Sequence, residues 1–138
     1  MNSHDTAMIG DDTLERGRNL SEQFNPGMEA TLEARYGHLL PDMARSTVDF
    51  VYGQQYSRPG LSLRDRYLAT IASLSGQGGQ TQPQLKINIV AGLKAGLSER
   101  EIAEVIWQMA LYGGLPAAIN ALNTALDVFG SLGKTDES

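Results

Sequence analysis

The segment SEREIAEVIWQMALYGGLPAAINALNTALDVF, residues 98–129, contains the pattern of two helices joined by a turn. Ser98 and Glu101 have the spacing of a capping box, in which the serine oxygen accepts a hydrogen bond from the third helical amide. Apolar residues then recur at steps of three and four, which gives one apolar helix face. These residues are Ile102, Val105, Ile106 and Met109. Glycines at 113–114 end this helix and Pro116 begins the next, as glycine stops and proline starts typically do.

The helix predicted over about residues 116–129 is rich in alanine. Its small residues are Ala117, Ala118, Ala121 and Ala125. Because small side chains let neighbouring backbones approach closely, we expect this helix to be tightly packed, either within the domain or between subunits.

Helical patterns also fill the sequence before residue 98. Ser62 and Asp65 form a second capping pair, and Pro83 stands at another helix start. The predicted helices cover about residues 12–24, 26–36, 41–52, 62–74 and 83–95, with irregular connections at 53–60 and 75–82. No segment alternates as a half-buried strand does. The sequence therefore predicts an all-α fold of six or seven helices.

A chain of 138 residues has the length of one domain. We expect a single helical domain over residues 11–129, between flexible segments at 1–10 and 130–138, which are small, polar or charged. The start of the chain lacks the pattern of a secretory signal, and no run of about 18 apolar residues occurs. A cytoplasmic protein is therefore expected.

Composition excludes several kinds of chemistry. The chain has no cysteine, which rules out disulfides, thiolate metal sites, cysteine nucleophiles and thiol peroxidase activity. Its net charge of −5 argues against nucleic acid or an anionic membrane as a partner. The two histidines, His4 and His38, lie far apart in different contexts, so no metal site and no cofactor are expected.

Three arginines lie within nine positions, at Arg58, Arg64 and Arg66. One interpretation is that they form surface ion pairs with Asp65 and nearby carboxylates. The other is that at least one faces a pocket, and Arg58 is the first candidate because it stands on an irregular connection. A guanidinium there would bind the carboxylate of a substrate, or a subunit partner.

Polar residues one helical turn apart form two further candidate sets. Gln84 and Asn88 share a helix face, and Asn88 is either a satisfied structural amide or part of a pocket wall that orients a ligand. Glu104, Gln108 and Tyr112 form the second row. Glu104 is either a solvated surface charge or a buried proton donor. Next to this row, Trp107 is expected in the core or at a subunit interface.

Four ordered blocks resemble the carboxymuconolactone decarboxylase family. They are YSRPGLSLRDR at 56–66, QLKIN at 84–88, LSEREIAEV at 97–105 and YGGLPAA at 112–118. The similarity runs from about residue 29 to residue 129. It implies the helical fold of alkylhydroperoxidase D-like proteins, assembled as homotrimers or hexamers.

The resemblance also shows where this chain departs from the family. The peroxidase branch has a Cys-x-x-Cys-x-x-x-His run, whose matching positions here are Thr81, Gln84 and Asn88. The decarboxylase branch usually has an acid and a histidine where Gln84 and Asn88 stand. Tyr67 occupies the position of a glutamate often found in the first motif helix.

The resemblance implies a lyase that acts on a small carboxylated lactone or related acid. In this interpretation Gln84, Asn88, Glu104 and Tyr112 are the candidate catalytic residues. The candidate substrate-binding residues are Arg58, Tyr67 and Gln108. The alternative is a catalytically reduced family member that binds a small carboxylate ligand or a partner protein.

Overall fold

The computed structural model describes residues 3–137, with side chains for residues 12–133, and this part of the chain is helical without strands. The predicted all-α class is thereby confirmed. The elements in order are α1 (Ser3–Phe24), α2 (Met28–Tyr36), α3 (Met43–Val48), the π-helix η1 (Asp49–Gln55), α4 (Leu63–Gly76), the 3₁₀ turn η2 (Gly79–Thr81), α5 (Gln82–Lys94), α6 (Glu99–Gln108), α7 (Ala110–Gly113) and α8 (Leu115–Glu137). None of the described helices is both long and apolar enough to cross a membrane.

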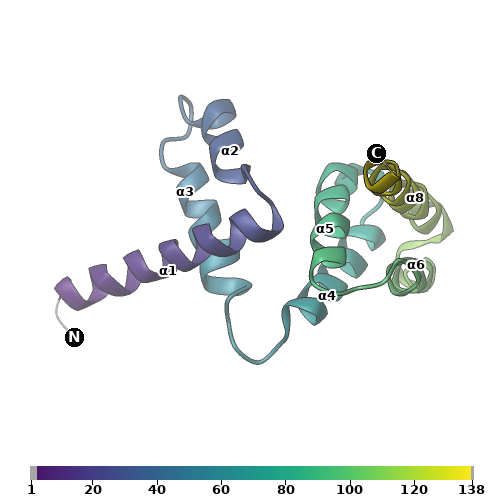
Figure 1. Cartoon of the computed structure of the whole chain (residues 1–138), viewed down its shortest axis with the longest axis horizontal. Helices are drawn as coiled ribbons and strands as arrows, with labels where there is room; N and C mark the ends of the chain where they lie inside the picture. The colour runs from purple at the N-terminus through teal and green to yellow at the C-terminus, as the bar shows by residue number, and fades with distance from the viewer. Residues whose placement is uncertain (1–2, 138) are drawn as a thin grey trace. The chain divides into compact units, whose positions relative to one another are not determined.

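The chain divides into two compact units, Met1–Leu61 and Ser62–Ser138. The first contains α1, α2, α3 and η1, and the second contains α4 to α8 (Figure 1). The single domain over residues 11–129 stays a prediction, and each unit is described below by itself.

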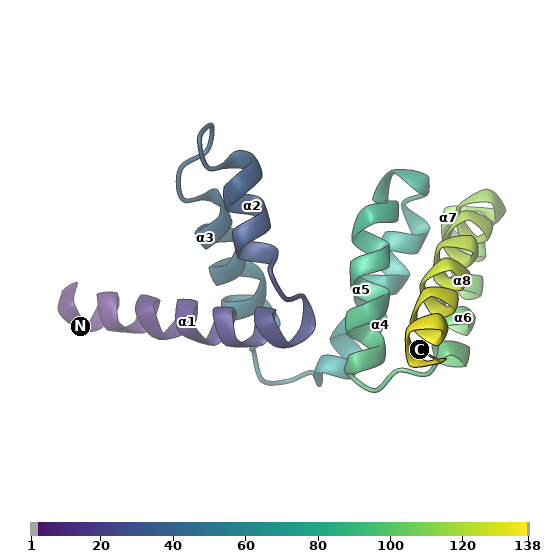
Figure 2. The same cartoon turned by 45° about the horizontal axis from the view of Figure 1, so that its top comes forward.

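The second unit is built around the alanine-rich face of α8. This helix packs against α5 and α6, as Figure 2 shows. The residues that α8 buries are mostly small: Ala118, Ala121, Thr124, Ala125 and Val128. The predicted tight packing of this helix is therefore confirmed within the unit, because small side chains let α8 lie close to its neighbours.

Both predicted capping pairs are present in the second unit. The Ser98 hydroxyl accepts a hydrogen bond from the Glu101 amide at 3.0 Å, and the Glu101 carboxylate accepts one from the Ser98 amide at 3.0 Å. The Ser62 hydroxyl likewise accepts from the Asp65 amide at 3.1 Å. The starts of α6 and α4 are thus set by local hydrogen bonds that the sequence pattern contains.

The first unit is held by a close crossing of α1 and η1 at two glycines. A Cβ atom at Gly17 would lie 2.9 Å from the Gly53 amide nitrogen and 2.7 Å from the carbonyl oxygen of Val48, the last residue of α3. One at Gly53 would lie 2.3 Å from the Thr13 carbonyl oxygen. Distances below 3 Å leave no room for a methyl group. Glycine at both positions is what allows the two backbones to touch.

The π-helix corrects the prediction that an irregular connection begins at residue 53. The Tyr56 amide donates to the Val51 carbonyl at 2.9 Å, which continues the helix in the wider π form. Glycine is common where helices end, but Gly53 lies inside this π-helix. Here it stays helical, and its missing side chain serves the contact with α1 instead.

Ion pairing connects α1 to α2. The Arg18 Nε and Nη2 atoms each donate to the Glu29 carboxylate at 2.9 Å. Hydrogen bonding from Arg18 lowers the pKa of Glu29. Since the pKa is lower in the folded state, the pair stabilises the unit at neutral pH, and this contribution is lost as pH falls through that pKa. Half of the Arg18 side chain is exposed, so solvent keeps the contribution small.

The two terminal helices are longer than predicted. Helix α1 begins at Ser3 rather than near residue 12, and α8 continues to Glu137 rather than ending near residue 129. No proline precedes Pro26 or follows Pro116, so nothing in either stretch forces a helix to stop. The flexibility of residues 1–10 and 130–138 stays a prediction.

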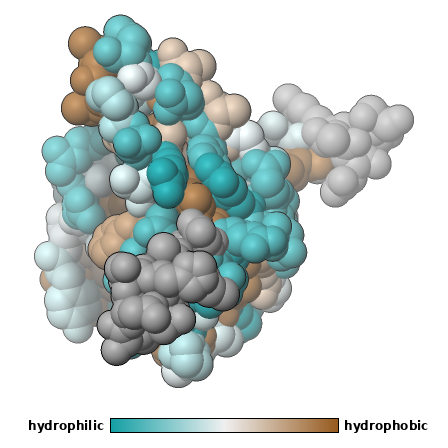
Figure 3. Space-filling model, turned by 90° about the vertical axis from the view of Figure 1, so that its left-hand side faces the viewer, coloured by the Kyte–Doolittle hydropathy of each residue, from teal (hydrophilic) through white to brown (hydrophobic). Residues whose placement is uncertain are grey.

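Figure 3 shows one face whose surface is largely hydrophilic, with hydrophobic residues gathered at its top, where Figure 1 places the α2–α3 connection. That connection exposes Leu39 and Leu40. Two adjacent leucines form too small a patch to indicate an interface by themselves.

Candidate functional site

A polar hollow of about 490 Å³ lies in the first unit. The residues that line it come from α1, from η1 and from the connection after η1: Thr13, Arg16, Gly53, Gln54, Ser57, Arg58 and Pro59. It contains two guanidinium groups, a side-chain amide and two hydroxyls. These lining residues include two arginines and no carboxylate, and the Asp49 carboxylate lies next to them, where it accepts a hydrogen bond from Gln54 Nε2 at 2.9 Å.

The crossing of α1 and η1 creates this hollow. Gly53 lets η1 touch α1 at Thr13, which places Arg16, one turn further along α1, at the same opening as Gln54. Arg16 Nη2 lies 3.5 Å from the Thr13 hydroxyl. After η1, the Ser57 hydroxyl donates to the Tyr52 carbonyl at 2.5 Å and holds the start of the connection.

Arg58 is one of the residues that line this hollow, and Arg64 forms ion pairs. Arg64 pairs with the Glu101 carboxylate of α6 and lies 3.5 Å from the Asp65 carboxylate. For Arg64 the prediction of a surface ion pair is confirmed. The pair with Glu101 also connects α4 to α6.

Gln84 and Asn88 share a face of α5 as predicted, and Asn88 is half-buried while Gln84 is exposed. The Asn88 side-chain amide donates to the Gln84 backbone carbonyl at 2.8 Å. This contact lies within one helix, which favours the interpretation of Asn88 as a structural amide.

Glu104 is a solvated surface charge. Its carboxylate accepts from Arg100 at 2.9 Å, one turn earlier, and 59% of its side chain is exposed. The first of the two interpretations of this residue is thus confirmed. Gln108 and Tyr112 are exposed as well, Tyr112 to 78%.

Tyr67 lies in the core of the second unit with no exposed surface. Its Cβ is 3.7 Å from the position that a Cβ at Gly92 would take, so it packs between α4 and α5. A side chain at this depth supports the helix packing, and its predicted contact with substrate stays a prediction.

The structure thus brings together some of the predicted site residues. Gln84 and Asn88 touch each other, while Tyr67 is buried and Glu104, Gln108 and Tyr112 lie exposed on α6 and α7. Arg58 belongs to the first unit and all the others to the second. The described residues contain no cluster of three or more histidine, aspartate or glutamate side chains that could hold a metal ion.

Sequence reasoning missed two polar lining residues, Arg16 and Gln54. Arg16 lies in a stretch whose charges look like an ordinary solvated helix face, DDTLERGR at residues 11–18. A signal was present only in Gly17, since a glycine inside a helical pattern often has a packing reason.

Comparison with known proteins gives three relatives and one family. The profile described as Carboxymuconolactone decarboxylase family matches residues 41–127. An uncharacterized 15.0 kDa protein of Paracoccus denitrificans is 35% identical over 116 residues, 84% of this chain and 87% of the relative. A 4-carboxymuconolactone decarboxylase of Acinetobacter baylyi is 38% identical over 88 residues, 64% of each chain. A nitrosuccinic acid decarboxylase of Metarhizium robertsii is 30% identical over 74 residues, 54% of this chain and 50% of the relative.

Proposed function

The chain belongs to the carboxymuconolactone decarboxylase family, and we propose that it is a carboxy-lyase that binds a small carboxylated lactone or related acid in its N-terminal unit. Two of its relatives are named as decarboxylases of such acids, 4-carboxymuconolactone and nitrosuccinic acid. The match covers less than two thirds of either decarboxylase, so their substrates serve here as the chemical class to test.

The observation that carries this proposal is the polar hollow lined by Arg16 and Arg58, which we call the arginine hollow. Guanidinium groups bind carboxylates through paired, charge-assisted hydrogen bonds. Arg16 and Arg58 both line the hollow, and Gln54 Nε2, which donates one hydrogen to Asp49 at 2.9 Å, has a second hydrogen to donate. A volume of about 490 Å³ suits a small molecule. The arrangement therefore favours an acid with two carboxylates, or one carboxylate and a lactone carbonyl.

The same groups suit decarboxylation. In this reaction the bond between the carboxyl carbon and its neighbour breaks, carbon dioxide leaves, and the electron pair stays on the neighbouring carbon. A carbonyl next to that carbon takes up the charge as an oxyanion, which Arg58 and Gln54 can stabilise by donating hydrogen bonds. A proton then replaces the lost carboxyl group. The described lining residues include no carboxylate and no imidazole to supply this proton, so we assign it to water.

A second candidate is a catalytically reduced member that binds the acid and turns it over poorly. The observation that favours it is the state of the groups available for proton transfer. Amides occupy positions 84 and 88, and the Glu104 carboxylate is exposed and paired with Arg100. A side-chain amide does not act as a general acid or base near neutral pH.

We expect Arg58→Met to weaken the binding of nitrosuccinate by about tenfold, because a bidentate guanidinium–carboxylate contact is lost. Calorimetric titration of the full chain measures this, with release of carbon dioxide followed in parallel. Arg16→Met should give a similar loss. Arg35→Met is the matched control, since Arg35 is an exposed arginine of the same unit that does not line the hollow. Equal affinities of the Arg58 and Arg35 variants would rule out the proposed site.

We also propose that the chain assembles as a homotrimer or hexamer. The end of α6, α7 and the first turns of α8 expose several large apolar side chains: Trp107, Leu111, Tyr112, Leu115 and Ile119. Such a patch is typical of an interaction surface, and a closed ring would bury it on every subunit.

Light scattering at micromolar concentration should therefore return three or six times the 14.9 kDa of one chain. Leu111→Lys should lower that mass, because Leu111 is 79% exposed and its replacement would place a charge in the interface. A mass of one chain for the unaltered protein would contradict the assembly.

A further inference from the structure

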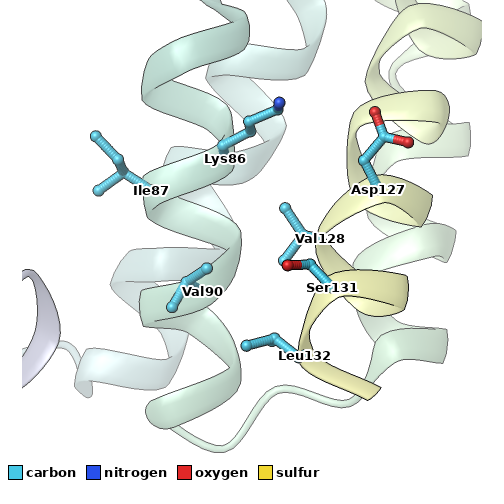
Figure 4. A pocket seen from close by; sticks show the side chains of 7 residues that line it. All are labelled: Lys86, Ile87, Val90, Asp127, Val128, Ser131 and Leu132. Atoms are coloured by element: carbon cyan, nitrogen blue, oxygen red, sulfur yellow. The ribbon is translucent and has the colours of Figure 1, made fainter. Parts of the chain in front are cut away.

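A second hollow, of about 300 Å³, lies between α5 and α8 in the C-terminal unit (Figure 4). Its lining residues are Lys86, Ile87 and Val90 from α5, and Asp127, Val128, Ser131 and Leu132 from α8. None of the residues predicted to bind substrate or to act in catalysis lines it. Its chemistry is different from that of the arginine hollow, because it has one charge of each sign and an apolar wall.

The charged and apolar groups lie at opposite ends of this hollow. In Figure 4 the Lys86 ammonium extends from α5 toward α8 at the same end as the Asp127 carboxylate, while Val90 and Leu132 lie at the other end. The ion pairs found among the described side chains include none between Lys86 and Asp127. The two opposite charges thus stand on facing helices without neutralising each other by contact.

The apolar end of this hollow includes a buried side chain of α8. Val128 is buried, with 7% of its surface exposed, since it belongs to the packed face of α8. Val90 is half-buried on α5, and Leu132 is exposed to 36%. An aliphatic group placed here would cover apolar surface that is now in water, which favours binding.

We propose that this hollow binds a free aliphatic α-amino acid. Its carboxylate would bind Lys86, its ammonium would bind Asp127, and its side chain would lie along Val90, Val128 and Leu132. A simple carboxylic acid would be repelled by Asp127 and a simple amine by Lys86, whereas a zwitterion satisfies both charges at once. The proposal does not depend on the proposed decarboxylase function, because the two hollows belong to different units.

Titration of the isotope-labelled full chain by NMR tests the ligand class. L-leucine should shift the amide signals of residues 86–90 and 127–132 in a saturable way. L-leucinamide lacks the carboxylate, N-acetyl-L-leucine lacks the ammonium, and glycine lacks the side chain. Each of these three ligands should bind at least about fivefold more weakly than L-leucine, which is the loss expected when one solvent-exposed contact is removed. If leucinamide or N-acetyl-leucine binds as tightly as leucine, the site takes the end of a peptide chain and the proposal is wrong.

Variants then assign each anchor. Lys86→Met should weaken leucine binding but not leucinamide binding, because it removes the charge that repels a simple amine. Asp127→Asn should likewise weaken leucine binding but not N-acetyl-leucine binding. Lys86→Arg keeps the charge and should retain binding. The matched control is Lys94→Met, since Lys94 is an exposed lysine on the same helix that does not line the hollow. The proposal fails if leucine causes no saturable shift, or if the Lys86 and Asp127 variants bind it as the Lys94 variant does.

Discussion

Gly53→Ala is expected to destabilise the N-terminal unit by about 3 kcal/mol or more, at the upper end of what overpacking costs. The added methyl group would lie 2.3 Å from the Thr13 carbonyl oxygen and 2.9 Å from the Thr13 Cγ2 atom. The first of these is a backbone atom inside α1, so it cannot move aside without shifting the whole helix. Because the same crossing forms the arginine hollow, the variant should also lose affinity for nitrosuccinate.

Urea unfolding followed by circular dichroism measures this effect. Gly130→Ala is the matched control, because a Cβ at this helical glycine of α8 would meet no atom within 4 Å. Alanine there should leave stability unchanged or raise it slightly, as alanine favours helix. Gly17→Ala should resemble Gly53→Ala, since its methyl group would lie 2.7 Å from the Val48 carbonyl oxygen. An unfolding midpoint of Gly53→Ala equal to that of Gly130→Ala would show that α1 and η1 do not cross as described.

The double variant Gln84→Glu with Asn88→His tests the alternative to the arginine hollow, a reaction at the face of α5 that the family resemblance indicates. A reaction at that face should gain turnover of a carboxylated lactone on the order of 10²-fold, the usual contribution of general acid–base catalysis. The two positions are one turn apart on α5, where Asn88 already contacts the Gln84 backbone. A carboxylate and an imidazole there would form a pair able to exchange protons near neutral pH. The resemblance to the decarboxylase branch places an acid and a histidine at these same positions.

Release of carbon dioxide from 4-carboxymuconolactone between pH 5 and pH 9 measures the gain. The double variant should show a rate change near pH 6.5, the ordinary titration range of histidine, that the unaltered chain lacks. Asn88→His alone should give part of the gain. If the correctly folded double variant binds and turns over the lactone as the unaltered chain does, this face of α5 takes no part in the reaction.

Helical class and several helix starts could be predicted from the sequence because they depend on local interactions. The hydrogen bonds of Ser98 with Glu101 and of Ser62 with Asp65 join residues three positions apart, so the residue spacing in the sequence is enough to predict them. Likewise, the alanine spacing after Pro116 predicts a helix that packs closely whatever its neighbours are. Family membership could also be predicted, because the resemblance consists of ordered blocks of residues in the sequence itself.

The candidate site depended on contacts between residues that are distant in the sequence. A glycine in the sequence can end a helix or let two helices touch. For Gly53, only the contact with Thr13 in the folded structure shows that it does the second. The π-helix was not predicted either, because π-helices are rare and the sequence pattern alone does not indicate one. Arg16 lines the arginine hollow together with Arg58 because α1 and η1 cross in the folded structure. Local sequence therefore determined the helices, while the tertiary structure decided which side chains meet, since that depends on how the helix faces pack together.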